Sequence, residues 1–204
     1  MMKNSDLFWA SKDSEEEMDN AASESDENLV YRDQNRIYFY SEVKRSKILV
    51  LNKILRKLDK DLVNRANYLD TTTPNIYLHV QSFGGSVFSA FSNIDYIQSS
   101  QTPIHSVIEG CAASAATMMS VVAAKRYITP HSYMLIHQLS SGAWGKYEEI
   151  KDSMKNCDRL MKMIKDIYLQ HTKIPKKKLD QILKHDLWFD AEQCLEYGLV
   201  DEII

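Results

Sequence analysis

The alternation of strand-like and helix-like segments in the middle of the chain constrains the fold more than any other feature. Residues 76–80, 104–108 and 133–136 each have the composition of a short buried strand. Residues 112–124 are almost all apolar or small, which predicts a buried helix. Strands that alternate with helices in this way predict a layered α/β domain.

Two longer helical patterns flank this region. Residues 43–59 carry isoleucines and leucines at helical spacing, and residues 147–171 predict a longer helix. In the longer one an apolar seam steps by four and three positions, through Ile150, Met154, Cys157, Met161, Ile164 and Tyr168. Such a seam serves either as a subunit interface or as packing within the same domain, and periodicity does not separate the two.

The chain divides into an acidic N-terminal segment, residues 1–35, and a folded domain, residues 36–204. Residues 1–28 hold nine carboxylates and two lysines, a net charge of −7. A segment this polar buries too little apolar surface to order itself. It acts either as a mobile arm that gates or docks something, or as a solvated tail.

Charge and composition argue against several classes of partner. The net charge of −3 does not favour nucleic acid or an anionic membrane. No stretch approaches the roughly 20 apolar residues of a membrane helix, and no secretory signal is visible. The three cysteines are an odd number without metal-ligand spacing, which favours free thiols in a reducing compartment.

Two turns have the residue types of an acyl-transfer site. Ser114 lies between pairs of alanines at the expected start of the buried helix. Small neighbours let a substrate approach the hydroxyl, and a helix N-terminus favours a developing oxyanion. A serine that caps a core helix has the same appearance. Gly84 and Gly85 follow the strand at 76–80 and permit the close backbone approach that a second oxyanion donor needs.

A histidine and an aspartate complete the candidate set. His137 directly follows the strand at 133–136, where an imidazole can face a cleft. Asp186 precedes three apolar residues, and a carboxylate there needs a partner such as a histidine. The alternatives are a structural histidine and a surface or helix-capping aspartate. No two histidines have the four-residue spacing of a zinc site, and we expect no metal or other cofactor.

Four motifs in this order resemble the ClpP family of serine peptidases. They are a strand and glycine turn at 76–87, the serine segment at 109–116, the histidine motif at 134–138 and a C-terminal signature at 197–201. The resemblance begins near Arg36 and covers four-fifths of the chain. It implies an α/β fold of the ClpP/crotonase type, a spiral of repeated β-β-α units with a protruding handle.

The same resemblance implies a Ser–His–Asp triad. Ser114 would be the nucleophile, His137 the general base and Asp186 the residue that orients the imidazole. Backbone N–H groups of Gly85 and Ala115 would hold the oxyanion. The implied activity is hydrolysis of peptide bonds in unfolded polypeptides by a Clp-type serine endopeptidase.

The resemblance also implies an assembly and a location. Two stacked rings, seven-membered in the family, would enclose a chamber and contact each other through the handle at residues 147–171. A Clp-type AAA+ unfoldase would use ATP to feed unfolded proteins and peptides into this chamber. The implied location is the cytoplasm, with the plastid stroma or the cytoplasm of a phage-infected bacterium as alternatives.

Three positions depart from the family pattern and keep other functions open. Phe83 and Leu139 stand where the family usually has proline, and His185 stands where it often has arginine. One alternative is therefore an inactive subunit that serves as a structural part of a Clp-type ring. Another is a crotonase-like acyl-CoA enzyme, which has the same fold but no use for a spaced Ser, His and Asp.

Overall fold

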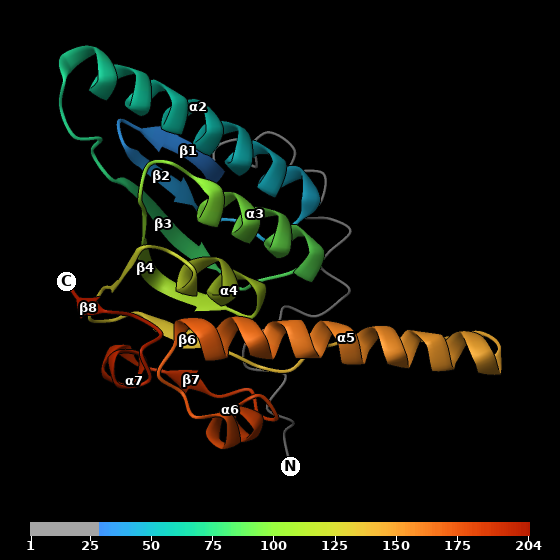
Figure 1. Cartoon of the computed structure of the whole chain (residues 1–204). Helices are drawn as coiled ribbons and strands as arrows, with labels where there is room; N and C mark the ends of the chain where they lie inside the picture. Colours follow the sequence, from blue (N-terminus) through green and yellow to red (C-terminus); the bar gives the residue numbers. More distant parts are fainter. Residues whose placement is uncertain (1–28) are drawn as a thin grey trace, which may run out of the picture.

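An eight-stranded sheet forms the centre of the protein, and helices α2, α3 and α4 lie against one face of it (Figure 1). This computed structural model describes residues 29–204, so the expectations for residues 1–28 lie outside the described residues. The elements in chain order are β1 (Val30–Asp33), β2 (Arg36–Phe39), α2 (Arg45–Leu69), β3 (Ile76–Ser82), α3 (Val87–Ser99), β4 (Ile104–Ala113), α4 (Ala115–Val121), β5 (Lys125–Ile128), β6 (Tyr133–Leu135), α5 (Tyr147–His171), α6 (Lys176–Ile182), β7 (Trp188–Phe189), α7 (Ala191–Glu196) and β8 (Glu202–Ile203).

The central strand β4 changes its partner half-way along its length. The sheet order is β1-β2-β3-β4-β5-β8, and every pair in it is parallel except β1 with β2. Residues 105–108 of β4 pair with β5, whereas residues 111–113 pair with β6. Gly110 lies between the two halves with a φ of 69°, a conformation that glycine adopts without strain. The change of partner brings the end of β4 beside β6.

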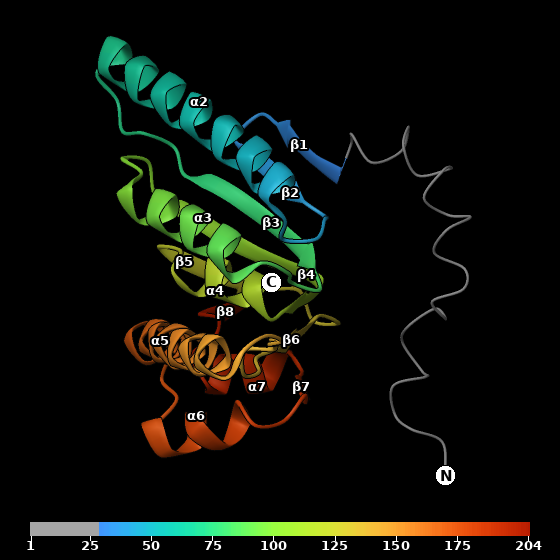
Figure 2. The same ribbon diagram turned by 90° about the vertical axis from the view of Figure 1, so that its right-hand side faces the viewer.

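The core lies between the sheet and its helices. Alternate residues of β3 (Ile76, Leu78 and Val80) are completely buried, as the period of a strand requires. Helix α2 packs its apolar stripe onto this face, and α3 lies beside it (Figure 2). Burial of each such side chain contributes about 1.5–3 kcal/mol. This packing fixes the strand ends that carry the candidate site.

Three sequence predictions need correction. Residues 112–124 were expected to be one helix, but Ala112 and Ala113 continue β4 and pair with β6, so α4 begins only at Ala115. Small apolar residues fit a buried strand as well as a buried helix, and periodicity does not distinguish them. Ordered structure was expected from Arg36, but β1 begins at Val30 because it pairs antiparallel with β2. The helix expected at 43–59 continues to Leu69.

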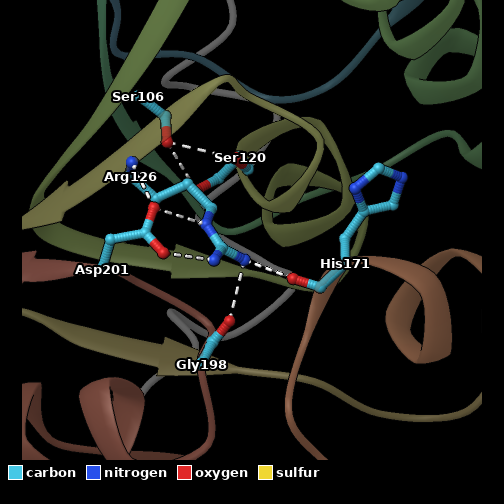
Figure 3. Close-up of polar contacts among 6 residues, drawn as sticks. All are labelled: Ser106, Ser120, Arg126, His171, Gly198 and Asp201. Carbon is cyan, nitrogen blue, oxygen red and sulfur yellow. Dashed lines mark hydrogen bonds and ion pairs between the residues drawn. The ribbon is translucent and has the colours of Figure 1, made fainter.

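Arg126 of β5 adds side-chain bonds between the sheet and the C-terminal part of the chain, beyond the pairing of β7 and β8. In Figure 3 the Arg126 guanidinium donates to both carboxylate oxygens of Asp201 and to the carbonyl oxygens of His171 and Gly198. The pKa of the Asp201 carboxyl is lowered, first by this hydrogen bond from Arg126 and then by the arginine's charge. Since His171 ends α5 and Gly198 follows α7, Arg126 holds both ends of the segment that contains Asp186.

Candidate active site

Ser114 occupies a tight turn between β4 and α4. Its φ and ψ are 54° and −125°, an unfavourable conformation for a residue with a side chain. The Ser114 N–H donates to the Leu135 carbonyl of β6 at 2.8 Å, and its carbonyl accepts from the Thr117 hydroxyl at 2.6 Å. These two bonds hold the turn in place. The serine is half-buried at the N-terminus of a buried helix.

The glycine turn after β3 packs directly against this serine. A Cβ on Gly84 would lie 2.7 Å from the Ser114 Cβ and 2.6 Å from the Ala113 carbonyl oxygen, so no side chain fits there. The turn is held by bonds from the Val43 N–H to Gly84 O and from the Ser86 N–H to Val43 O, both 2.7 Å. Gly85 therefore has its φ of 140° in a turn with a fixed position.

Two backbone N–H groups at these turns are available to a ligand. Within residues 29–204, the turn and loop bonds leave the Gly85 N–H without an acceptor. Ala115 is the first residue of α4, so its N–H has no acceptor within the helix. Gly85, Ser114 and Ala115 all line one small cleft of about 90 Å³. This is the arrangement that the sequence predicts for an oxyanion site, and the roles of the two N–H groups stay a prediction.

His137 and Asp186 meet although 49 positions separate them in the chain. β6 and β7 pair antiparallel, with Leu135 opposite Trp188, and this pairing places the two residues side by side. The His137 Nδ1 lies 3.2 Å from the Asp186 Oδ1. His137 is largely buried and Asp186 is 77% exposed. The histidine thus has a carboxylate at one ring nitrogen.

Ser114 and His137 line the same cleft, but no direct bond joins their side chains within the described residues. Hydrogen bonds at catalytic sites are often long without substrate and shorten when it binds. The structure therefore brings Ser114 and His137 to one cleft, and Asp186 lies at the far side of the His137 ring. Their catalytic roles remain a prediction.

Two further residues support the serine and were not singled out from the sequence. The Tyr168 hydroxyl of α5 lies 2.6 Å from the Thr117 Oγ1, and the Thr117 hydroxyl donates to the Ser114 carbonyl. Tyr168 is completely buried, and this burial raises the pKa of its phenol. A tyrosine within an apolar helical seam was the available signal, since a buried hydroxyl needs a partner.

Helix α5 has the bounds that the sequence predicts, Tyr147–His171. Only Ile164 and Tyr168 in it are buried, both in its C-terminal part. Tyr147, Ile150 and Met154 are exposed, on the part of the helix that extends away from the sheet (Figure 1). The apolar seam therefore packs within the domain at one end only.

The described residues offer no metal centre and no membrane helix. Within residues 29–204, no three His, Cys, Asp or Glu side chains are grouped closely enough to hold a metal ion. No helix in the same range is long and apolar enough to cross a membrane.

Comparison with known proteins decides the family. The profile of the Clp protease family matches residues 32–204. The chain belongs to the Clp protease family. This match confirms the family that the sequence motifs predict. The family match and the mixed sheet and helices together confirm the predicted α/β fold class.

Clp protease subunits from two bacterial genera are among its relatives. It is 31% identical over 150 residues to the ATP-dependent Clp protease proteolytic subunit 1 of Chlamydia caviae, and these residues make up 71% of this chain and 78% of the relative. It is 29% identical over 160 residues to the ATP-dependent Clp protease proteolytic subunit 2 of Treponema denticola, and these residues make up 76% of this chain and 80% of the relative. These relationships support a peptidase role.

The three departures from the Clp protease pattern have different surroundings. Phe83 is 66% exposed and its ring packs edge-on against Trp188, with the ring centroids 6.3 Å apart. Leu139 lines the cleft and donates its N–H to the Met161 sulfur at 3.0 Å. His185 is exposed, directly before Asp186. Phe83 and Leu139 thus both have packing partners in this protein.

Proposed function

We propose that this Clp protease chain is a serine endopeptidase, with Ser114 as nucleophile, His137 as general base and Asp186 as the group that orients the imidazole. The observation that carries the proposal is the meeting of three segments at one cleft. A serine on a strained turn lies beside a histidine whose other ring nitrogen faces a carboxylate at 3.2 Å. Triads are recognised by geometry rather than by chain order, and this arrangement supports the proposed roles.

The chemistry follows from the orientation of His137. With a hydrogen on Nδ1 directed at Asp186, the His137 Nε2 has a free lone pair that can take the Ser114 proton. The Ser114 oxygen then bonds to the peptide carbonyl carbon, whose oxygen becomes an oxyanion. His137 gives the proton to the leaving amine nitrogen, and the C–N bond breaks to leave an acyl-enzyme. Water, deprotonated by His137, then attacks the acyl carbon, the ester bond to Ser114 breaks to release the new carboxylic acid, and His137 returns the proton to the Ser114 oxygen.

The oxyanion would be held by the N–H groups of Gly85 and Ala115. Both border the cleft, and neither has a competing acceptor among the bonds described above. One such donor contributes about 2.7–4 kcal/mol to catalysis, because it is aimed at charge that develops only in the transition state. The close packing of Gly84 against Ser114 fixes the distance between the two turns.

The proposal extends to the assembly. The exposed apolar end of α5, with Tyr147, Ile150 and Met154, would contact a second copy across two stacked, seven-membered rings of identical subunits. A Clp-type AAA+ unfoldase would supply unfolded chains and use the ATP, and the cytoplasm would be the site of action. Access to the chamber would then limit which proteins are cut.

The test is cleavage of a short fluorogenic peptide by the purified protein, with particle mass measured by light scattering. Ser114→Ala should abolish cleavage and labelling by a fluorophosphonate, whereas Ser140→Ala, on the same cleft, should retain both. Equal activity of the parent and Ser114→Ala would contradict the proposal. A large particle without cleavage would favour the structural ring subunit instead.

A further inference from the structure

An exposed aromatic pair lies beside the candidate active site. The Phe83 ring packs edge-on against the Trp188 ring, with the ring centroids 6.3 Å apart. Phe83 is 66% exposed and Trp188 is 38% exposed, so both rings keep apolar surface open to solvent. Phe83 directly precedes Gly84, the residue that packs against Ser114. Paired aromatic rings at this place offer a contact surface to a chain bound at Ser114.

The strand pairing places this aromatic pair next to His137 and Asp186. Leu135 of β6 lies opposite Trp188 of β7. The 3.2 Å contact between His137 Nδ1 and Asp186 Oδ1 continues this pairing two positions further along each segment. Residues two positions apart on a strand have side chains on the same face. The Phe83 and Trp188 rings therefore lie one step along the strands from the His137–Asp186 pair.

The proposed mechanism assigns the two sides of Ser114 to different parts of a substrate. The acyl group stays on Ser114 with its oxygen at the Gly85 and Ala115 N–H groups, so the cleft that holds all three takes the residue before the scissile bond. The rest of that cleft is lined mainly by Val87, Met118, Leu139, Ile164 and Tyr168. The leaving amine must reach His137, so the residue after the scissile bond lies on the histidine side. The aromatic pair lies on that side and outside the cleft lining.

We propose that Phe83 and Trp188 form the subsite for the residue that follows the scissile bond, and that this subsite favours a large apolar or aromatic side chain. The inference rests on the proposed peptidase function and adds a substrate preference to it. Because Phe83 stands where the family usually has proline, the preference is a property of this chain and not of the family pattern. Contact with one further aromatic ring favours binding by roughly two- to tenfold.

The experiment measures which amine attacks the acyl-enzyme. The full chain is acylated from a short peptide ester, and L-phenylalaninamide or glycinamide is added at equal concentration. The amine nitrogen bonds to the acyl carbon, the ester bond to Ser114 breaks, and the amine proton passes through His137 to the Ser114 oxygen. Since this step is the reverse of acylation by an amide, the attacking amine takes the place of the leaving amine.

The measured quantity is the ratio of amide product to hydrolysed acid, determined by mass spectrometry. Both products come from the same acyl-enzyme, so the ratio does not depend on how fast that intermediate forms. If Phe83 only held the glycine turn in place, its replacement would slow acylation and leave the preference between the two amines unchanged. The ratio therefore separates substrate contact from structural support.

The parent should prefer phenylalaninamide to glycinamide by about fivefold. Phe83→Ala and Phe83→Pro should reduce this preference to below about twofold, whereas Phe83→Tyr keeps the ring and should retain it. The matched control is Phe88→Ala, which should keep the parent's preference. Phe88 is 71% exposed on α3 and packs edge-on against Phe91, with the ring centroids 6.5 Å apart.

The outcomes separate this subsite from the peptidase proposal. Acyl transfer from Ser114 without a preference in the parent, or with an unchanged preference in both Phe83→Ala and Phe83→Pro, would overturn the subsite alone. Equal loss of the preference in Phe88→Ala would also overturn it. If the parent gives no Ser114-dependent product with either amine or with water, the proposed function is wrong and the subsite with it.

Discussion

Arg126→Met should destabilise the protein by about 2–3 kcal/mol while keeping most of the packing of the side-chain stem. The arginine makes two charge-assisted bonds to Asp201 and two bonds to the carbonyls of His171 and Gly198. Losing one partner of a buried ion pair costs roughly 3–5 kcal/mol, whereas an exposed pair contributes about 0–1 kcal/mol. The Arg126 side chain is 13% exposed and that of Asp201 34%, so the expected value lies between these limits.

The assay is urea unfolding followed by circular dichroism at one fixed protein concentration, because self-association adds to apparent stability. Arg126→Lys keeps the charge but loses the two-pronged geometry, and about 1–2 kcal/mol should be lost. Asp201→Asn and the double variant complete a cycle, with an expected coupling of about 1–2 kcal/mol. An Arg126→Met protein within about 0.5 kcal/mol of the parent would refute this account of the contact.

The pH dependence gives a second check on the same contact. Arg126 lowers the pKa of the folded Asp201 carboxyl below its unfolded value of about 3.9. Its stabilisation is therefore present above that value and is lost as pH falls through the lower, folded pKa. Arg126→Met should lose less stability than the parent between pH 5 and pH 2.

Three further changes test the site and the sheet. Gly84→Ala should reduce peptidase kcat at least about a hundredfold, because its Cβ would displace Ser114; peptide cleavage checks this. Asp186→Asn should lower kcat roughly 10²–10⁴-fold with little change in KM, measured by steady-state kinetics. His105→Phe removes an unpaired, buried Nδ1 and should leave stability equal or raise it by about 1 kcal/mol in urea unfolding. Burial, and then the charge of Lys125, lower the pKa of His105 in the folded protein. The free energy of unfolding of the parent should therefore fall as the pH drops below about 6.5, and that of His105→Phe should fall less.

The sequence predicted the elements whose periodicity extends over many residues. Helix α5 has the expected bounds because its apolar seam continues for about five turns. Residues 112–113 were assigned wrongly, since two alanines carry no information about whether they belong to a strand or a helix. Strand β1 was missed because its residues 30–33 have three exposed side chains out of four, and its formation depends on pairing with β2.

The sequence indicated the candidate site residues, but not the hydrogen bonds that hold their segments in place. The approach of His137 to Asp186 was expected from a family resemblance, because no periodicity relates residues 49 positions apart. The bond from Tyr168 to Thr117 crosses from α5 to α4, and the bonds of Arg126 cross between three elements. Such contacts depend on how the elements pack, so single-sequence patterns do not contain them.

The late position of Asp186 in the chain has a consequence for biosynthesis. A ribosome delivers the proposed nucleophile and base well before β7, whose pairing with β6 brings Asp186 to His137. Asp201, the anchor for Arg126, emerges later still, 75 positions after its partner. Contacts between residues so far apart in sequence form slowly and only after synthesis has passed both. The order of residues along the chain therefore delays completion of the His137–Asp186 pair until β7 has been synthesised.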